Sequence, residues 1–410
     1  MQKKLYNKDY LLMLQGSAFS VFGDILYSIA ISIWVYEKTK STSLMGVMAS
    51  ISLFVRMFGS PIAGAFVDQS DRKVIIVGMD LIRGLLMFGL AYLAFQDDLT
   101  VPIVLLAALV AAFCHLFFVP ATMTVMIDLI PHHKMMKGQS LHQGISSLLN
   151  FTGKALSGLL INFFGVPWMI LLNGISYLLS ALSELFITIP KTPKATKSFS
   201  FKNLWLNFKQ GAIETVQDKM LRKLIFLALG INLFSSGIFS LFLPFTDQKG
   251  FTIVQYGYLM SVVSLAGIVA MMITATFNFK PLNQHRLMFY GFVVGMGLEI
   301  LAYLSMNFTT MASLFFIGSL LETIANASLN AVLILAIPQE KRALVLGFVM
   351  AGSSGGMALS ALGYGFMAEF VPLSILGAIG LMIALMPMVL LGTDRDIKQL
   401  FVYNEIKLEN

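Results

Sequence analysis

Several ionisable side chains lie inside long apolar stretches of this sequence, and five of them are considered first: Asp24, Arg56, His115, Lys154 and Glu322. A carboxyl or imidazole group in such a place can take up and release a proton, and a cation can pair with it or attract an anion. A charge inside a membrane costs at least about 2.5–3.5 kcal/mol, so each should face protein or a water-filled cavity and have a partner. These residues are therefore candidates for proton transfer, ion pairing or ligand binding.

The depth of these charges indicates which of them can meet. At ~1.5 Å per residue from the cytoplasmic ends of their helices, Asp24 and Lys154 both lie about 21 Å deep and Arg56 about 18 Å deep. Asp24 is the natural partner of Lys154 or Arg56, in a functional site or in a pair that only fixes helix packing. Glu299 and Glu322 lie at ~18–20 Å. Glu322 has no obvious basic neighbour in the C-terminal half, and desolvation favours its protonated form, so it could be a proton site.

The composition places these charges in an integral membrane protein, because 57% of the 410 residues are hydrophobic and only 12% are charged. Apolar runs long enough to cross a hydrocarbon layer of ~30 Å recur along the chain. The first continues to about Tyr36 with no small-residue cleavage site, so we expect a retained span and not a signal peptide. We predict an all-α fold of twelve transmembrane helices in two pseudo-symmetric six-helix bundles. The predicted spans are 10–36, 44–67, 74–95, 102–128, 140–163, 168–189, 222–245, 254–277, 287–306, 310–335, 343–369 and 372–391.

The basic residues behind the net charge of +7 gather in connections on one side, such as "DQSDRK" and "PQEKRA". This bias predicts that both termini and the long central loop are cytoplasmic, and it argues against nucleic acid as the partner. Within that loop, "FSFKNLWLNFKQGAIETV" predicts an amphipathic helix along the membrane surface or packed on the bundle. The predicted organisation is a bundle at 1–189, a connector at 190–221, a second bundle at 222–391 and a cytoplasmic tail at 392–410.

The segment "GAFVDQSDRK" stands between the second and third spans. It resembles the signature loop of the major facilitator superfamily, with Gly64, Asp68, Arg72 and Lys73 at the motif positions. A glycine here lets helices approach closely, and the aspartate can accept hydrogen bonds from a helix N-terminus and pair with a basic residue. Such a cluster can lock a cytoplasmic gate, although the charges could instead serve topology alone. The nearby "DLIRG" extends this network, and we expect its Asp80 and Arg83 to form a structural pair.

Two further stretches resemble one branch of that superfamily. "VPATMTVMIDLIP" and the D-x-x-D-R-K form of the loop are similar to bacterial macrolide efflux proteins and siderophore exporters. "GKALSG" resembles the helix-5 motif of drug:proton antiporters, with small residues at Gly153, Ser157 and Gly158 and with Lys154 in the place of a proline. The resemblance implies a central cavity bearing the five ionisable residues named first, with Glu299 outside it. A histidine in the position of His115 is more often a hydrogen-bonded core residue than a proton carrier.

The resemblance implies a secondary active exporter of amphiphilic small molecules, macrolide-like drugs among them, in the cell membrane. Protons would drive antiport by alternating access, and the expected partners are substrate, protons and membrane lipids, with the protein a monomer. No Gly-Lys-Ser/Thr phosphate loop, zinc motif or catalytic triad is present, so we expect neither an enzyme nor a cofactor. Two alternatives stay open. One is a flippase or exporter of an anionic amphiphile such as a lysolipid, glycolipid or siderophore, and the other is a receptor or scaffold that does not transport.

Overall fold

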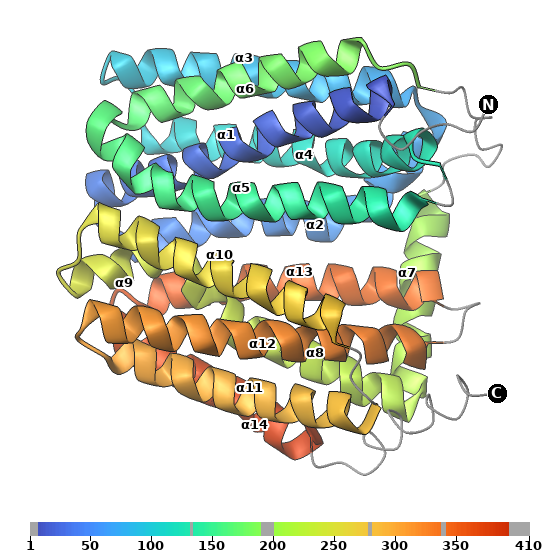
Figure 1. Ribbon diagram of the computed structural model, residues 1–410, viewed down its shortest axis with the longest axis vertical. Coiled ribbons are helices and arrows are strands. Elements are labelled where there is room, and N and C mark those ends of the chain that lie inside the picture. The colour runs from blue at the N-terminus through green and yellow to red at the C-terminus, as the bar shows by residue number, and fades with distance from the viewer. Residues whose placement is uncertain (1–6, 132–133, 190–200, 278–280, 338–341, 393–410) are drawn as a thin grey trace. The chain divides into compact units, whose positions relative to one another are not determined.

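The computed structural model describes residues 7–131, 134–189, 201–277, 281–337 and 342–392. These parts of the chain form fourteen helices (Figure 1). The bounds are α1 Lys8–Thr39, α2 Thr42–Gln69, α3 Arg72–Phe95, α4 Val101–Leu129, α5 Met135–Phe164, α6 Val166–Leu185, α7 Phe201–Gln217, α8 Lys219–Phe239, α9 Phe242–Gln248, α10 Ile253–Thr276, α11 Pro281–Leu304, α12 Phe308–Ala336, α13 Arg342–Met367 and α14 Leu373–Gly392.

Eleven of the twelve predicted spans each fall on one of these helices, and the all-α membrane fold is confirmed. Ten helices in the described part of the chain are long and apolar enough to cross a membrane, judged by length and composition. Helix α14 adds a shorter apolar stretch, Leu373–Val389. Helix α5 is not among the ten, because glutamine, serine, asparagine and lysine recur along it.

The predicted span 222–245 is wrong in one respect, since it is two helices and not one. Helix α8 ends at Phe239 and α9 begins at Phe242. Pro244 explains the break, because it has no N–H to donate to the carbonyl of Ser240, four residues earlier, and its ring would collide with that carbonyl. The turn is closed locally, where the Ser240 hydroxyl donates to the carbonyl of Gly237 at 2.6 Å.

The predicted helix of the central connector is present as α7, Phe201–Gln217. In its second half, Ile213 and Val216 are exposed, whereas Thr215 is buried. Its place on a membrane surface stays a prediction. The start of the connector at 190–200, the tail at 393–410 and the first basic residues of the chain lie outside the described residues.

The helices divide into two units. Unit 1 comprises Met1–Lys40, Phe58–Phe201 and Ile253–Ser261, and unit 2 comprises Ser41–Met57, Lys202–Thr252 and Val262–Asn410. Each unit thus takes in a piece of helix from the other half of the sequence, the first part of α2 or of α10. The division into bundles at 1–189 and 222–391 stays a prediction.

Close packing in unit 1 depends on glycine. Helix α6 packs against both α1 and α3, and α3 also packs against α4 (Figure 1). A Cβ atom at Gly23 of α1 would lie 2.1 Å from the Ser176 hydroxyl and 2.5 Å from the Asn173 side-chain oxygen of α6. Only a residue without a side chain lets the two backbones come this close, and the approach places polar groups of α6 beside α1.

Candidate functional site

Helix α6 carries a row of buried polar side chains. They recur every three or four residues, which places them on one face of the helix. The row consists of Asn173, Ser176, Tyr177, Ser180 and Glu184. Because α1 and α3 pack on α6, this face meets the charged residues of those two helices.

Arg83 of α3 lies at the centre of a buried charge cluster. Its side chain is 1% exposed, and its Nη2 donates a hydrogen bond to Oδ1 of Asp80, one turn earlier. The guanidinium group lies 4.4 Å from the ring centroids of both Phe118 of α4 and Tyr177 of α6. Cation–π contacts of this kind stabilise a cation away from water. One arginine therefore joins three helices of unit 1.

Asp24 enters the same cluster from α1. The Tyr177 hydroxyl donates a hydrogen bond to Oδ1 of Asp24, and the Asp24 carboxylate also interacts electrostatically with Arg83. The structure thus brings Asp24 together with Tyr177, and the ion pair between Asp24 and Lys154 stays a prediction.

The cluster contains more acids than bases. The carboxyl groups of Asp24, Asp80 and Glu184 surround the single guanidinium of Arg83, and both oxygens of Glu184 are buried without a hydrogen-bond partner among the described residues. Oδ2 of Asp80 and Nε of Arg83 are likewise buried without a hydrogen-bond partner among the described residues. An unpaired buried polar group costs roughly 1–3 kcal/mol of folding stability, so a functional role is expected for such groups. Carboxyl groups that share one cation can hold protons.

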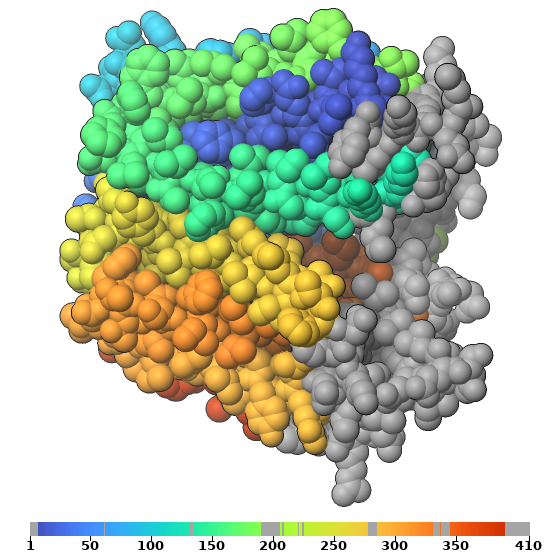
Figure 2. Space-filling view, viewed as in Figure 1, coloured from blue at the N-terminus to red at the C-terminus, as the bar shows by residue number. Residues whose placement is uncertain are grey.

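Helix α5 has the close contacts that its small residues predict. It lies beside α1 in unit 1, as Figure 2 shows. A Cβ atom at Gly153 would lie 3.0 Å from the Ile25 side chain of α1, and one at Gly158 would lie 2.9 Å from the Ile253 carbonyl oxygen of α10. Lys154 is partly buried between these two contacts, and its carbonyl accepts a hydrogen bond from the Ser157 hydroxyl at 2.8 Å.

The loop before α3 is held by ionic contacts that the sequence predicts only in part. Nη1 of Arg72 lies 2.6 Å from Oδ2 of Asp128 at the end of α4. Nζ of Lys73 donates to the carbonyl of Ile187, just after α6, at 2.9 Å. Asp71 caps α3, since its Oδ1 accepts from the backbone N–H of Lys73 at 2.9 Å. The two basic residues thus fasten α3 to α4 and to the end of α6.

The expected roles of Gly64 and Asp68 stay predictions. A Cβ atom at Gly64 would meet no atom of the described residues of its own unit within 4 Å. Asp68 is exposed and has no hydrogen-bond partner within the described ranges. The cap of α3 comes instead from Asp71, three residues later and next to the helix, where its side chain reaches the first free N–H groups.

The other predicted residues lie on other helices. His115 is exposed on α4 in unit 1, and Arg56 is exposed on α2 in unit 2. Glu322 lies on α12 in unit 2, with its side chain against α11.

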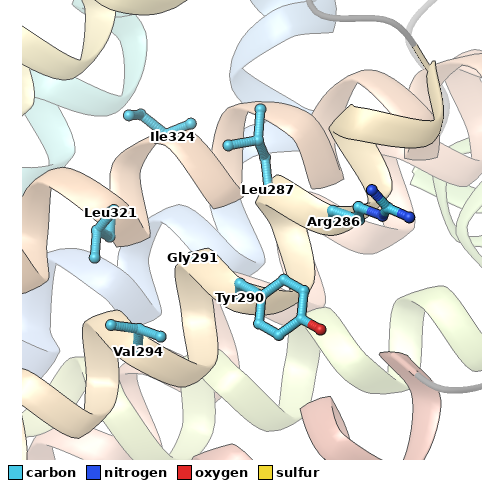
Figure 3. Close-up of a pocket in the computed structure, with 7 residues that line it drawn as sticks. All are labelled: Arg286, Leu287, Tyr290, Gly291, Val294, Leu321 and Ile324. Atoms are coloured by element: carbon cyan, nitrogen blue, oxygen red, sulfur yellow. The ribbon is translucent and has the colours of Figure 1, made fainter.

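Unit 2 also has an open groove between α11 and α12, with a volume of about 470 Å³ (Figure 3). Apolar side chains line most of it, and Arg286 stands at one end. Its residues are Arg286, Leu287, Tyr290, Gly291, Val294, Leu321 and Ile324.

Comparison with known proteins decides the family. The model of the Major Facilitator Superfamily matches residues 13–298. The chain belongs to the Major Facilitator Superfamily. It is therefore a multi-pass membrane protein and a secondary transporter, not an enzyme.

Solved structures of this superfamily agree on the fold. NupG, a nucleoside transporter, has a TM-score of 0.76 at 12% identity over 95% of this chain and all of its own. A bacterial homologue of the human lysosomal transporter Spinster has a TM-score of 0.67 at 14% identity, covering 96% of this chain and 95% of its own.

Three curated superfamily members from bacteria are similar in sequence. The transporter YkuC of Bacillus subtilis is 24% identical over 76% of this chain and 74% of its own. Macrolide efflux protein A of Streptococcus pyogenes is 26% identical over 51% of this chain and 52% of its own. BacE of Bacillus subtilis, named as a bacilysin exporter, is 28% identical over 58% of this chain and 57% of its own. The chain thus matches little more than half the length of these two export proteins.

Sequence reasoning missed most partners of the charges in this superfamily member. Tyr177 and Glu184 could have been predicted from the sequence, because polar residues at helical spacing on α6 interrupt an otherwise apolar span. Asp128 and Phe118 gave no such signal, since only the packing of α4 against α3 shows that they face Arg72 and Arg83.

Proposed function

We propose that this transporter exports amphiphilic small molecules, macrolide-like compounds among them, across the cytoplasmic membrane in exchange for protons. The observation that carries the proposal is the similarity to macrolide efflux protein A and BacE, two superfamily members whose names state export. The basic loops support an orientation with both termini in the cytoplasm. Alternating access would move the bound compound between the two sides.

Asp24 is the proposed proton carrier of unit 1. Its Oδ1 accepts a hydrogen bond from the Tyr177 hydroxyl, so Oδ2 is the oxygen that would take up a proton. Protonation from outside removes the negative charge that Tyr177 and Arg83 stabilise, and release of the proton to the cytoplasm restores it. The alternation between a neutral and an anionic Asp24 gives the two conformations different free energies, as coupling requires. Glu322 is the proposed second carrier, in unit 2.

An assay in cells tests the export. Cells that overproduce the wild-type protein should accumulate less of a macrolide than cells that produce the Asp24→Asn variant at the same level. Dissipating the proton gradient should abolish that difference. Equal accumulation in the two strains, at equal amounts of protein in the membrane, would rule out proton-driven macrolide export through Asp24.

A second candidate function is export or flipping of an anionic amphiphile. It is favoured by Lys154, a cation that lies partly buried in the most polar span, α5. A cation there can receive an anionic head group, whereas a neutral or cationic drug gives it no direct role. Lys154→Met in proteoliposomes separates the cases. If Lys154→Met loses transport of anionic lysolipids and keeps transport of macrolides, the anionic cargo is favoured. If the wild type transports macrolides but no lysolipids, the anionic cargo is contradicted.

A further inference from the structure

Glu299 of α11 and Glu322 of α12 face each other's helix in unit 2. Each follows a glycine by four residues, Gly295 and Gly318. A Cβ atom at Gly295 would lie 2.9 Å from Cγ of Glu322, and one at Gly318 would lie 2.7 Å from Cγ of Glu299. Each glutamate thus covers the glycine of the other helix, and the arrangement is reciprocal.

The two carboxyl groups are buried together. Glu299 is 1% exposed, and its Oε1 accepts a hydrogen bond from the Ser319 hydroxyl of α12 at 2.7 Å. Oε2 of Glu299 and Oε1 of Glu322 are buried with no hydrogen-bond partner among the described residues. The two groups interact electrostatically with each other. One oxygen on each side is therefore available for a bond between them.

An aromatic cluster closes one side of the pair. Tyr303 follows Glu299 by one turn of α11, and Phe315 precedes Ser319 by one turn of α12, with ring centroids 5.1 Å apart. Two rings of α9 join them: Phe242 and Phe245. Apolar rings here keep the surroundings of the carboxyl groups low in dielectric, which strengthens repulsion between like charges.

The charged and titratable groups of the surrounding elements are few. Lys249, after α9, donates to the carbonyl of Ser305 at 2.5 Å, beyond the aromatic cluster. Arg286, at the far end of the groove, lies about 20 Å along α11 from Glu299 at 1.5 Å per residue. Tyr303 interacts electrostatically with both carboxyl groups, and the hydroxyl of Tyr364 on α13 donates to a backbone carbonyl. Helix α14, Leu373–Gly392, has no charged side chain. No described cation is placed to neutralise two anions.

We propose that Glu299 and Glu322 form a proton-binding site, in which one proton shared by the two carboxyl groups joins α11 to α12. The proton is covalently bound to one of the two free oxygens and is donated to the other. Two carboxylates that are buried together and interact electrostatically repel each other when both are ionised, so uptake of one proton stabilises the hairpin and its loss loosens it. Two carboxylates and one hydroxyl offer fewer oxygens than the six to eight that Ca²⁺ takes. This site deepens the proposed role of Glu322 as a proton carrier by adding Glu299, and the site itself exists whether or not transport uses protons.

Infrared spectroscopy of the full-length protein in lipid nanodiscs tests the site through the carbonyl band of protonated carboxyl groups. In the wild type, this pair should contribute one protonated carboxyl group to the band. In Glu299→Gln and in Glu322→Gln, the remaining carboxyl group has no anionic neighbour and should ionise with a midpoint about 1–3 pH units lower. The double variant should lack the contribution of the pair, and Glu37→Gln, the same change at an exposed position of α1, should leave that contribution unaltered.

Ser319→Ala gives an independent measurement that keeps both glutamates. It removes a hydrogen bond that stabilises the Glu299 anion, so the midpoint should rise, opposite to the effect of the glutamine variants. If the single glutamine variants titrate at the wild-type midpoint, or if Ca²⁺ or Na⁺ removes the band at constant pH, the shared proton is refuted. Neither reading depends on transport, so failure of the proposed export would not imitate failure of this site.

Discussion

At the scale of single residues, the Tyr177 hydroxyl is the contact on which the proposed role of Asp24 depends. Tyr177→Phe removes the donor and leaves the ring over Arg83 in place. A hydrogen bond to a charged group contributes about 1.5–3 kcal/mol, and its loss disfavours the Asp24 anion. We expect lower stability, measured by thermal unfolding in detergent.

Tyr92→Phe is the matched control, because Tyr92 is 65% exposed on α3. It should leave the unfolding temperature unchanged. A Tyr177→Phe protein with the wild-type unfolding temperature would show that the hydroxyl does not stabilise the Asp24 carboxylate.

The residue scale is also where the sequence predicted least. It identified Asp24, Arg83 and Glu322 as buried charges, because a charge in an apolar run is visible without a structure. Their partners come from rotation about the helix axes and from neighbours far along the chain, such as Tyr177, which is 153 residues from Asp24. Depth counted along one helix carries neither kind of information.

At the scale of helices, the contact between α1 and α6 is set by the absence of a side chain at Gly23. Gly23→Ala would place Cβ 2.1 Å from the Ser176 hydroxyl, and overpacking of this kind costs about 1–3 kcal/mol. Gly89→Ala on α3 is the same change in open space and should be neutral or stabilise by about 0.5–1 kcal/mol, because alanine favours the helix. Gly23→Ala should lower the unfolding temperature and Gly89→Ala should not; equal shifts would contradict the packing described for α1 and α6.

The N-terminus of α2 gives a pH-dependent prediction. The backbone N–H of Ser43 and the Ser41 hydroxyl donate to Oε1 of Glu369, at 3.0 and 2.8 Å, and these hydrogen bonds lower the pKa of the Glu369 carboxyl. A lowered pKa means that the stabilisation is complete above the unfolded value, about 4.3, and is lost as the pH falls below it. Glu369→Gln should therefore lower the unfolding temperature modestly at pH 7 and leave it unchanged near the acid end of the titration. The exposed Glu37→Gln is the control, and a deficit that persists in acid would contradict the cap.

Helix positions were the most predictable feature, since apolar length and period depend on local sequence. The exceptions have local physical causes that a count of apolar residues overlooks. Pro244 divides one predicted span into α8 and α9, and the predicted span 140–163 is a polar helix, α5, whose close contacts are made by Gly153 and Gly158.

At the scale of the whole molecule, the fold of the superfamily followed from the spans and from the loop before α3, and the comparisons confirm it. Substrate and coupling could not follow in the same way, because they depend on a few side chains within a fold that serves nucleosides in NupG and macrolides in an efflux protein. Export driven by protons is therefore the claim that needs measurement.

Transport in proteoliposomes under an imposed proton gradient tests that claim most directly. We predict that the wild-type protein moves a macrolide against the proton flow, that collapse of the gradient stops it, and that Asp24→Asn together with Glu322→Gln abolishes the proton-driven part while substrate exchange continues. Proton-driven transport that is intact in the double variant would contradict the account.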